Sequence, residues 1–367
     1  MKNKGIIYKE NALTLIELIL VIIIVLLLII ISMSIKRDNN KIYENTHINR
    51  DSEWYVNNLY MSDQYYYNNI LNDEEKEVYG QIFNCIKNMN EEFIYTCSRS
   101  SFDKVMHAIM CDHPEMINFT VYSSNNRNNK IIFKYLCADE ESLNKKIEEM
   151  QYEIYKISKD VNKELSDYEK EKIIYEILAE RSYYGGYLDN SDQSAYTAIM
   201  KDKSTVCAGY AKAAQILFQT FNIKSFLMVN NGHMWNLVKL DDEYYYFDAT
   251  PSSDKYLEDG FSHSGLNQNI NTSNYESPYL SYFPSAEGTK YNYYDYEGKT
   301  LIYDKKDLSN IEQILNENKR KKVEIKVKNE RDFLNDINNI KEKLNLRYIK
   351  YCGGYLSNSK IFFLRKK

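Results

Sequence analysis

The longest run of apolar side chains lies near the start of the chain. Residues 12–33 read ALTLIELILVIIIVLLLIIISM, and Glu17 is the one charged residue among them. A membrane-spanning helix needs about 20 such residues. Lys36 and Arg37 follow the run, without the small-residue cleavage site of a secretory signal. The pattern predicts a transmembrane helix over residues 13–34, preceded by a basic leader over residues 1–12.

The charges on the two sides of this predicted helix are nearly balanced and orient it only weakly. A lone N-terminal span before a large domain commonly acts as an uncleaved signal. We therefore expect a cytoplasmic leader and a single-pass protein of the cell membrane, with the rest of the chain outside the cytoplasm. Residues 35–52 are polar and aperiodic, which is typical of a tether.

A mainly helical region is predicted over residues 53–164. In the segment from Asp73, apolar residues recur with helical spacing, and Asp73 can cap that helix. A second helix is expected to end at Pro114, and a long one to cover roughly residues 142–161. Residues 119–124 and 130–138 look like two strands around a polar loop.

The next region, residues 165–290, combines helices with a predicted three-stranded sheet. One helix is expected from about Asp167, which can cap it, to Arg181. Another begins after Ser204 or Thr205, either of which can cap it. Strands are predicted at 224–229, 233–240 and 244–249, separated by turn residues at 230–232 and 241–242.

The remaining residues, 291–367, are predicted to form a C-terminal α/β extension. Strands are expected at 300–304, 322–328 and 347–351, with a helix near 330–344. The whole pattern predicts an α+β protein.

Composition narrows the range of functions. The 47 basic and 52 acidic residues give a net charge of −5 with no long basic block, so no nucleic-acid partner is indicated. None of the six cysteines belongs to a C-x-x-C pair, which argues against a zinc ribbon or a thioredoxin-like motif. His113 adjoins Cys111 and Asp112, but adjacent residues cannot easily share one ion, and no second cluster supplies ligands. We expect neither a metal nor a cofactor.

Three residues in order suggest an activated thiol. Cys207 lies in the first turn of its predicted helix, where it is either a small buried hydrophobe or a nucleophile whose thiolate the helix terminus favours. His233 opens a strand, with Trp235 two residues later on the same face. Asp248 ends the next strand. Folding that hairpin brings 233 and 248 within about two residues of each other, so the imidazole can take the thiol proton and the carboxylate can orient the ring.

Three motifs carry a family resemblance. VCAGYAKAAQILF, HMWNLVKLDDEYYYFDAT and the preceding YLDNSDQSAYTAI closely resemble bacterial, clostridial-type transglutaminase-like proteins, over about residues 165–255. The resemblance implies a papain-like fold, in which a nucleophile helix packs on an antiparallel sheet. It also implies Cys207 as nucleophile, His233 as base and Asp248 as orienting acid. Gln193 and Trp235 become candidates for binding the oxyanion or the substrate.

The chain departs from this family at one place. Members often carry Trp-Asp after the D-x-T motif, whereas Pro251 follows Thr250 here. This departure affects the expected substrate groove and not the triad of Cys207, His233 and Asp248.

The apolar N-terminal segment has a resemblance of its own. Thr14 to Leu18 match, in order, the T-L-I-E-L run of type IV pilins and pseudopilins, whose basic leader is cut just before it. An acid inside a span is costly and hints at function. Ala12 stands where the family usually has glycine. A cleaved pilin-like signal and a plain anchor both remain open.

The expected function is acyl transfer or hydrolysis on amides of extracellular or cell-wall proteins or peptides, through a thioester on Cys207. The alternative is a non-catalytic binding or assembly module with the same fold, including the head of a pilin-like subunit. The sequence does not distinguish water from an amine as the acceptor.

Overall fold

The computed structural model describes ten stretches of the chain. They are residues 64–125, 129–186, 191–230, 232–250, 262–267, 277–303, 307–317, 322–342, 344–351 and 361–366. The predicted leader, transmembrane helix and tether lie outside these residues. Within the described stretches, no helix is both long enough and apolar enough to cross a bilayer.

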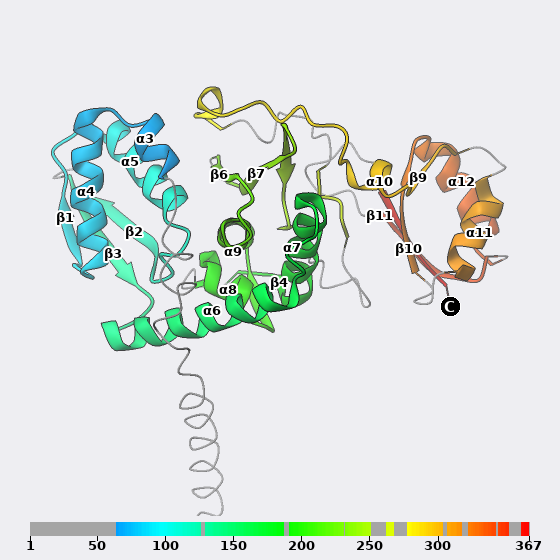
Figure 1. Cartoon of the computed structure of the whole chain (residues 1–367), viewed down its shortest axis with the longest axis horizontal. Helices are drawn as coiled ribbons and strands as arrows, with labels where there is room; N and C mark the ends of the chain where they lie inside the picture. The colour runs from blue at the N-terminus through cyan, green and yellow to red at the C-terminus, as the bar shows by residue number, and fades with distance from the viewer. Residues whose placement is uncertain are drawn as a thin grey trace, which may run out of the picture. The chain divides into compact units, whose positions relative to one another are not determined.

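The first part of the described chain combines helices with a small sheet (Figure 1). Its elements are α3 (Tyr65–Asn69), α4 (Asp73–Lys87), β1 (Glu92–Ile94), α5 (Arg99–Asp112), β2 (Phe119–Asn125) and β3 (Lys130–Tyr135). The three strands pair antiparallel in the order β1-β3-β2. On α4, the predicted apolar face is buried at Val78, Ile82, Cys85 and Ile86, as expected from the helical spacing.

The cap predicted for α4 was wrong by one residue. Asn72 is the N-cap, and its side chain accepts a hydrogen bond from the backbone N–H of Glu75. The Glu75 carboxylate in turn accepts from the Asn72 N–H. Asp73 therefore lies in the first turn of α4 and does not cap it. Its negative charge there interacts favourably with the positive end of the helix dipole.

A layer of helices and two short strands precedes the predicted sheet. The elements are α6 (Glu140–Asp160), α7 (Asp167–Arg181), β4 (Ser182–Tyr184), the 3-10 turn η1 (Ser191–Gln193), α8 (Ala195–Ile199), β5 (Lys203–Thr205) and α9 (Cys207–Thr220). Strands β4 and β5 pair in parallel. The bounds of α7 agree with the prediction, but Ser166, rather than Asp167, caps it.

The predicted three strands form one antiparallel sheet. They are β6 (Ser225–Val229), β7 (Met234–Leu240) and β8 (Glu243–Phe247), in the order β6-β7-β8. Asn236 on β7 donates to the Ala211 carbonyl of α9 at 3.0 Å. Its neighbour Leu237 must point to the opposite face, where its partner Phe226 meets Tyr65 of α3 at 4.5 Å between ring centroids. Helices thus cover both faces of this sheet.

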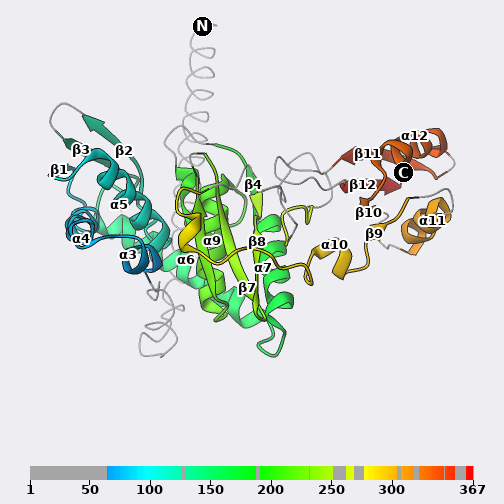
Figure 2. The ribbon, with the colours of Figure 1, turned by 90° about the horizontal axis from the view of Figure 1, so that it is seen from above.

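Helix α9 is the central helix of this part; it packs on β6 and β7, and Figure 2 shows it alongside β7. Residues 209–218 of α9 are all buried, which explains why its sequence is apolar almost all round. A helix surrounded in this way is fixed in position by contacts on every side. Its first residue, Cys207, is only partly buried.

The C-terminal part is a four-stranded sheet with helices. Its elements are α10 (Tyr293–Tyr296), β9 (Thr300–Leu301), α11 (Asp307–Glu317), β10 (Lys322–Val327), α12 (Glu330–Ile340), β11 (Leu346–Tyr351) and β12 (Ile361–Lys366). The strand order is β11-β12-β10-β9. Helix α11 and strand β12 were not predicted. The described residues are therefore mixed α+β with several small sheets.

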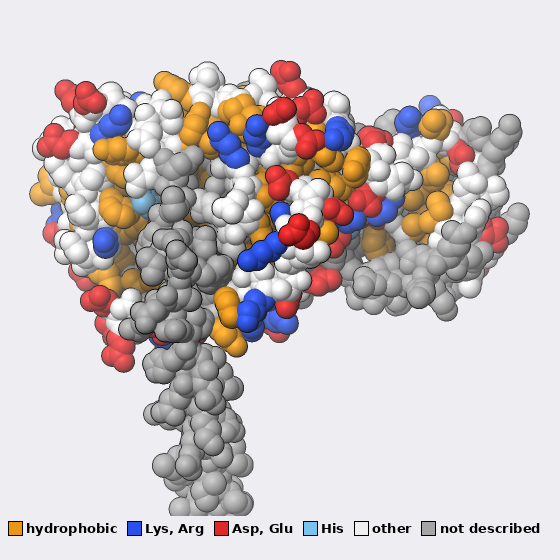
Figure 3. All heavy atoms as spheres, viewed as in Figure 1, with side chains coloured by type: hydrophobic (Ala, Val, Ile, Leu, Met, Phe, Trp, Pro, Cys, Tyr) orange, Lys and Arg blue, Asp and Glu red, His pale blue; other side chains and the backbone are white. Residues whose placement is uncertain are grey.

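His263 lies in a short buried segment, residues 262–267. Its ring stacks on Tyr293 at 4.0 Å between centroids. Its two nitrogens bond to Glu176 and to Glu324 of β10, each at 3.1 Å. The face drawn in Figure 3 carries acidic and basic side chains intermixed over the described residues.

Candidate active site

His233 and Asp248 meet at one end of the β6-β7-β8 sheet. His233 directly precedes β7 and Asp248 directly follows β8. Asn236 pairs with Phe247, so positions 233 and 248 are offset by two residues in the register, as the hairpin predicted. The His233 Nε2 donates to Asp248 Oδ2 at 2.7 Å. The backbone N–H of Thr250 donates to the other carboxylate oxygen at 3.0 Å, which fixes the carboxylate plane.

The environment favours a charged pair. Burial opposes the imidazolium, but the charge and hydrogen bond of Asp248, together with a hydrogen bond to Cys207, raise the pKa of His233 to about 10. Asp248 is almost completely buried, and burial alone would raise its pKa. The charge and hydrogen bond of His233 outweigh that effect and lower it. The pair is thus imidazolium and carboxylate at neutral pH.

Cys207 is the third member of the group. Its thiol hydrogen-bonds the His233 side chain. Because Nε2 is occupied by Asp248, Nδ1 is the ring nitrogen left for the sulfur. The structure therefore brings the three predicted residues together in the order thiol, imidazole, carboxylate.

The cap predicted for the Cys207 helix was wrong. Val206 is the N-cap of α9 and supplies no side-chain hydrogen bond. Ser204 and Thr205 belong to β5, and the Thr205 hydroxyl donates to the Asp192 carbonyl at 2.8 Å. The first-turn N–H groups of α9 are therefore left without a side-chain cap beside the sulfur, in the position where a helix end stabilises an anion.

The segment around η1 packs against the first turn of α9 through a glycine. A Cβ on Gly209 would lie 2.0 Å from Thr205 Oγ1, 2.7 Å from the Asp192 carbonyl oxygen and 3.0 Å from that of Ser194. Only glycine permits this approach. The glycine of the C-x-G motif thus allows residues 192–194 to lie against the helix that starts at Cys207.

Gln193 lies in this segment and is partly exposed. Its carbonyl accepts a hydrogen bond from Lys212 Nζ at 3.3 Å. The structure places Gln193 at the start of α9, which is compatible with the predicted contact to an oxyanion.

Trp235 occupies a different environment from the one a substrate-binding residue needs. Its side chain is 0% exposed. The indole stacks on His233, with 5.8 Å between centroids and 14° between planes, and meets Tyr246 edge-on. The indole therefore contacts the His233 imidazole and keeps that ring nearly parallel to its own plane.

Two residues near the site were not anticipated. Tyr184 pairs with Thr205 in the β4–β5 register and is 52% exposed, which places a phenol at the rim close to Cys207. Burial of part of its ring, followed by the charges of Cys207, Asp192 and Asp248, raises the pKa of Tyr184. Lys212 is buried inside α9. A lysine within the apolar run AKAAQILF was a signal available in the sequence.

The described residues contain no group of three or more histidine, cysteine or acidic side chains arranged to hold a metal. His113 Nδ1 instead bonds Glu115 at 2.8 Å, and Asp112 accepts from the backbone N–H groups of Tyr66 and Tyr67.

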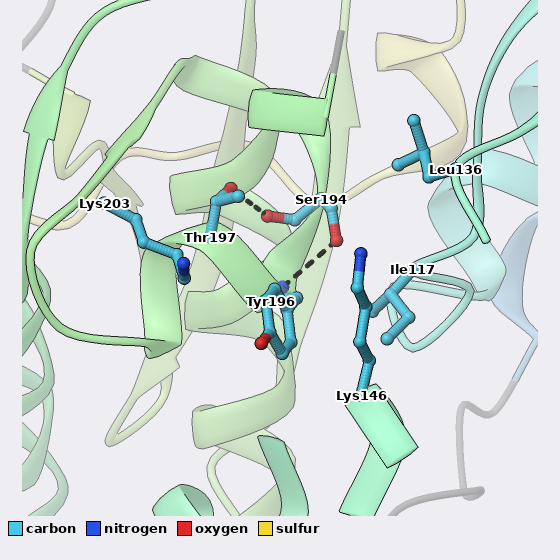
Figure 4. A pocket seen from close by; sticks show the side chains of 7 residues that line it. All are labelled: Ile117, Leu136, Lys146, Ser194, Tyr196, Thr197 and Lys203. Atoms are coloured by element: carbon cyan, nitrogen blue, oxygen red, sulfur yellow. Dashed lines mark hydrogen bonds between the residues drawn. The ribbon is translucent and has the colours of Figure 1, made fainter. Parts of the chain in front are cut away.

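The described residues also enclose a cavity of about 160 Å³ (Figure 4). Cys207, His233 and Asp248 are not among the residues that line it. Tyr196 lies in it between two lysines, with Lys146 and Lys203 each within 6 Å of the ring centroid. Its lining residues are Ile117, Leu136, Lys146, Ser194, Tyr196, Thr197 and Lys203.

In comparisons with known proteins, no family model matches the sequence and no curated protein matches it significantly.

Proposed function

We propose that the chain is a transglutaminase-like cysteine enzyme with a papain-like core, which transfers or hydrolyses acyl groups of protein or peptide amides. One observation carries the proposal. His233 bonds Asp248 through Nε2 at 2.7 Å and also bonds the Cys207 thiol, which stands at an uncapped helix N-terminus. A thiol, an imidazole and a carboxylate in this order form an activated nucleophile.

The first half of the reaction follows from these positions. The Cys207 thiolate attacks the carbonyl carbon of a carboxamide, and the carbonyl oxygen becomes an oxyanion. The backbone N–H of Cys207 and the Gln193 side chain are the proposed donors to that oxygen. The His233 imidazolium gives its proton to the departing nitrogen. The C–N bond breaks, and ammonia or an amine leaves a thioester on Cys207.

The second half uses the same groups in reverse. Neutral His233 takes a proton from water or from an acceptor amine, which attacks the thioester. The C–S bond breaks and the thiolate returns, paired again with the imidazolium. Water yields a carboxylic acid, whereas an amine yields a new amide. Asp248 stabilises the imidazolium in both halves, and Trp235 keeps the ring in plane.

The proposed location rests on the sequence of residues 1–34. An anchor over 13–34 would place the enzyme outside the cytoplasm, facing surface or cell-wall proteins. N-terminal peptide mapping of the native protein tests how this segment is processed. A peptide that retains Met1 or Lys2 supports a plain anchor, whereas one that begins at Leu13 supports a pilin-like path.

The function is tested with a fluorescent primary alkylamine as acceptor and a mixture of unfolded proteins as acyl donors. Covalent incorporation of the amine indicates transfer, and release of ammonia or of new carboxyl groups without incorporation indicates hydrolysis. Cys207→Ala is the control and should abolish either product. Equal product from Cys207→Ala would refute the proposal, and binding to the unfolded proteins without any product would favour the non-catalytic module.

A further inference from the structure

Lys212 has an unusual environment for a lysine. It lies in the middle of α9 and is 5% exposed. Among the residues that the structure describes, it forms no ion pair with a carboxylate. Lysine is seldom buried unless its charge is compensated, because removing an ammonium from water is costly. Some other group must therefore balance this charge.

The direction of the side chain brings its ammonium toward the start of α9. Side chains on a helix lean toward its N-terminus. Lys212 Nζ accordingly reaches back to donate to the carbonyl of Gln193 at 3.3 Å, although Lys212 follows Cys207 by five residues. The ammonium thus holds the backbone of the segment that packs on the nucleophile's turn.

Three titratable groups face the ammonium from the surrounding elements. They are Cys111 of α5, Glu115 just after α5, and Cys207 on the same helix. Burial raises the pKa of Cys111 to about 12, so that thiol stays neutral. The Glu115 carboxylate is already bonded to His113. Two anions can therefore balance the charge of Lys212, the Glu115 carboxylate and the Cys207 thiolate, and Cys207 is the one that lies on the same helix.

The charge state of Lys212 is consistent with this arrangement. Burial lowers the pKa of Lys212 to about 8, while Cys111, Cys207 and Glu115 act in the opposite direction. The ammonium is therefore present across the neutral range and is lost near the upper end of it.

We propose that Lys212 is a positioning residue for the nucleophile: its buried ammonium fixes the Gln193 carbonyl and stabilises the Cys207 thiolate from inside the helix. The inference rests on the proposed role of Cys207 as the reacting thiol. It adds a second cation to the site, besides His233, and accounts for the presence of a lysine among the buried residues of α9.

The test is the pH profile of Cys207 alkylation by iodoacetamide in the full-length protein. Lys212→Met keeps the length of the side chain and removes its charge. We expect the midpoint of the profile to rise by about half a pH unit or more, which is about a threefold slower reaction below the midpoint. Lys212→Arg should restore the midpoint, and Lys224→Met, at an exposed lysine, should leave it unchanged.

A reciprocal measurement covers the case in which Lys212→Met does not fold. In protein carrying 13C-labelled lysine, the Lys212 signal should titrate near pH 8 and should move to lower pH in Cys207→Ala, by the same amount, because coupling between two sites is mutual. Superimposable alkylation profiles in folded Lys212→Met, or a Lys212 titration unaffected by Cys207→Ala, would overturn the inference. A wild-type Cys207 that shows no enhanced reactivity would instead refute the proposed function.

Discussion

Replacing Asp248 with asparagine changes the charge of the site while leaving its shape. The amide oxygen can still accept from Thr250 N–H, and a neutral imidazole leaves no unpaired charge buried, so the fold should be retained. The amide cannot stabilise an imidazolium. We therefore expect thermal unfolding close to that of the wild type, with the change confined to the chemistry of Cys207.

The size of the effect follows from the His233 environment. The charge and hydrogen bond of Asp248 are the main reasons why the pKa of His233 is about 10 despite its burial. Without them the value should fall to its ordinary ~6.5 or below. At pH 8 the imidazolium share would then drop from ~99% to ~3%. The thiol would lose its charged partner over the whole neutral range.

The assay is alkylation of Cys207 by limiting iodoacetamide between pH 5.5 and 9.5. An unassisted thiol ionises near pH ~8.5, so at pH ~6.5 only about 1% of it is thiolate. We expect Asp248→Asn to react at least about tenfold more slowly there and to approach the wild-type rate above pH ~9.

The matched control is Asp242→Asn. Asp242 lies in the β7–β8 turn with its side chain fully in water, and the substitution should leave the profile unchanged. A profile of Asp248→Asn that superimposes on the wild type would show that the aspartate only ends a strand.

Two further predictions concern stability. Gly209→Ala places a Cβ 2.0 Å from Thr205 Oγ1 and should destabilise the fold by about 1–3 kcal/mol in urea unfolding. In Gly80→Ala the new Cβ meets nothing within 4 Å, and the substitution should stabilise α4 by about 0.5–1 kcal/mol. Equal effects of the two substitutions would contradict the packing described. Burial raises the pKa of Glu171 to about 8, against the opposing hydrogen bond of Asn267, so the folded state keeps a proton that the unfolded chain loses near pH ~4.3, and stability should fall as pH rises from there to about 8. Glu171→Gln should flatten this slope in thermal unfolding; an unchanged slope would refute the assignment.

The hairpin and the approach of His233 to Asp248 could be predicted because they depend on local patterns. The turn residues Asp241 and Asp242 set the β7–β8 register, and that register places His233 near Asp248. The order of Cys207, His233 and Asp248 along the chain then suggested the candidate group. The predicted helix of Cys207 was also found, since apolar spacing determines it.

The caps were harder to place. At α4 and α7 an acidic residue follows the true cap, Asn72 or Ser166, and both residue types suit the position. The residues before α9 form strand β5. This strand exists because it pairs with β4, which lies earlier in the chain. At α9, hydrogen bonds between distant segments therefore decided what local propensity could not.

The buried charges were harder to predict. Glu171 has ordinary helical spacing, and only the packed structure shows that it is buried, whereas the apolar run around Lys212 was a signal in the sequence. His263 likewise sits between Tyr175 and Tyr293, which come from different segments of the chain. Strand β12 was missed because its pairing with β10 and β11 needs residues far apart in the sequence.

The most direct test of the central claim is a comparison of all thiols in the native protein. Brief treatment with limiting iodoacetamide near neutral pH, followed by peptide mass spectrometry, measures each cysteine separately. Burial raises the pKa of Cys85, Cys97 and Cys111, whereas Cys207 is partly exposed and bonded to His233. We predict that Cys207 is modified far ahead of the others. Modification of Cys85 or Cys352 at the same rate would contradict the assignment of Cys207 as the nucleophile.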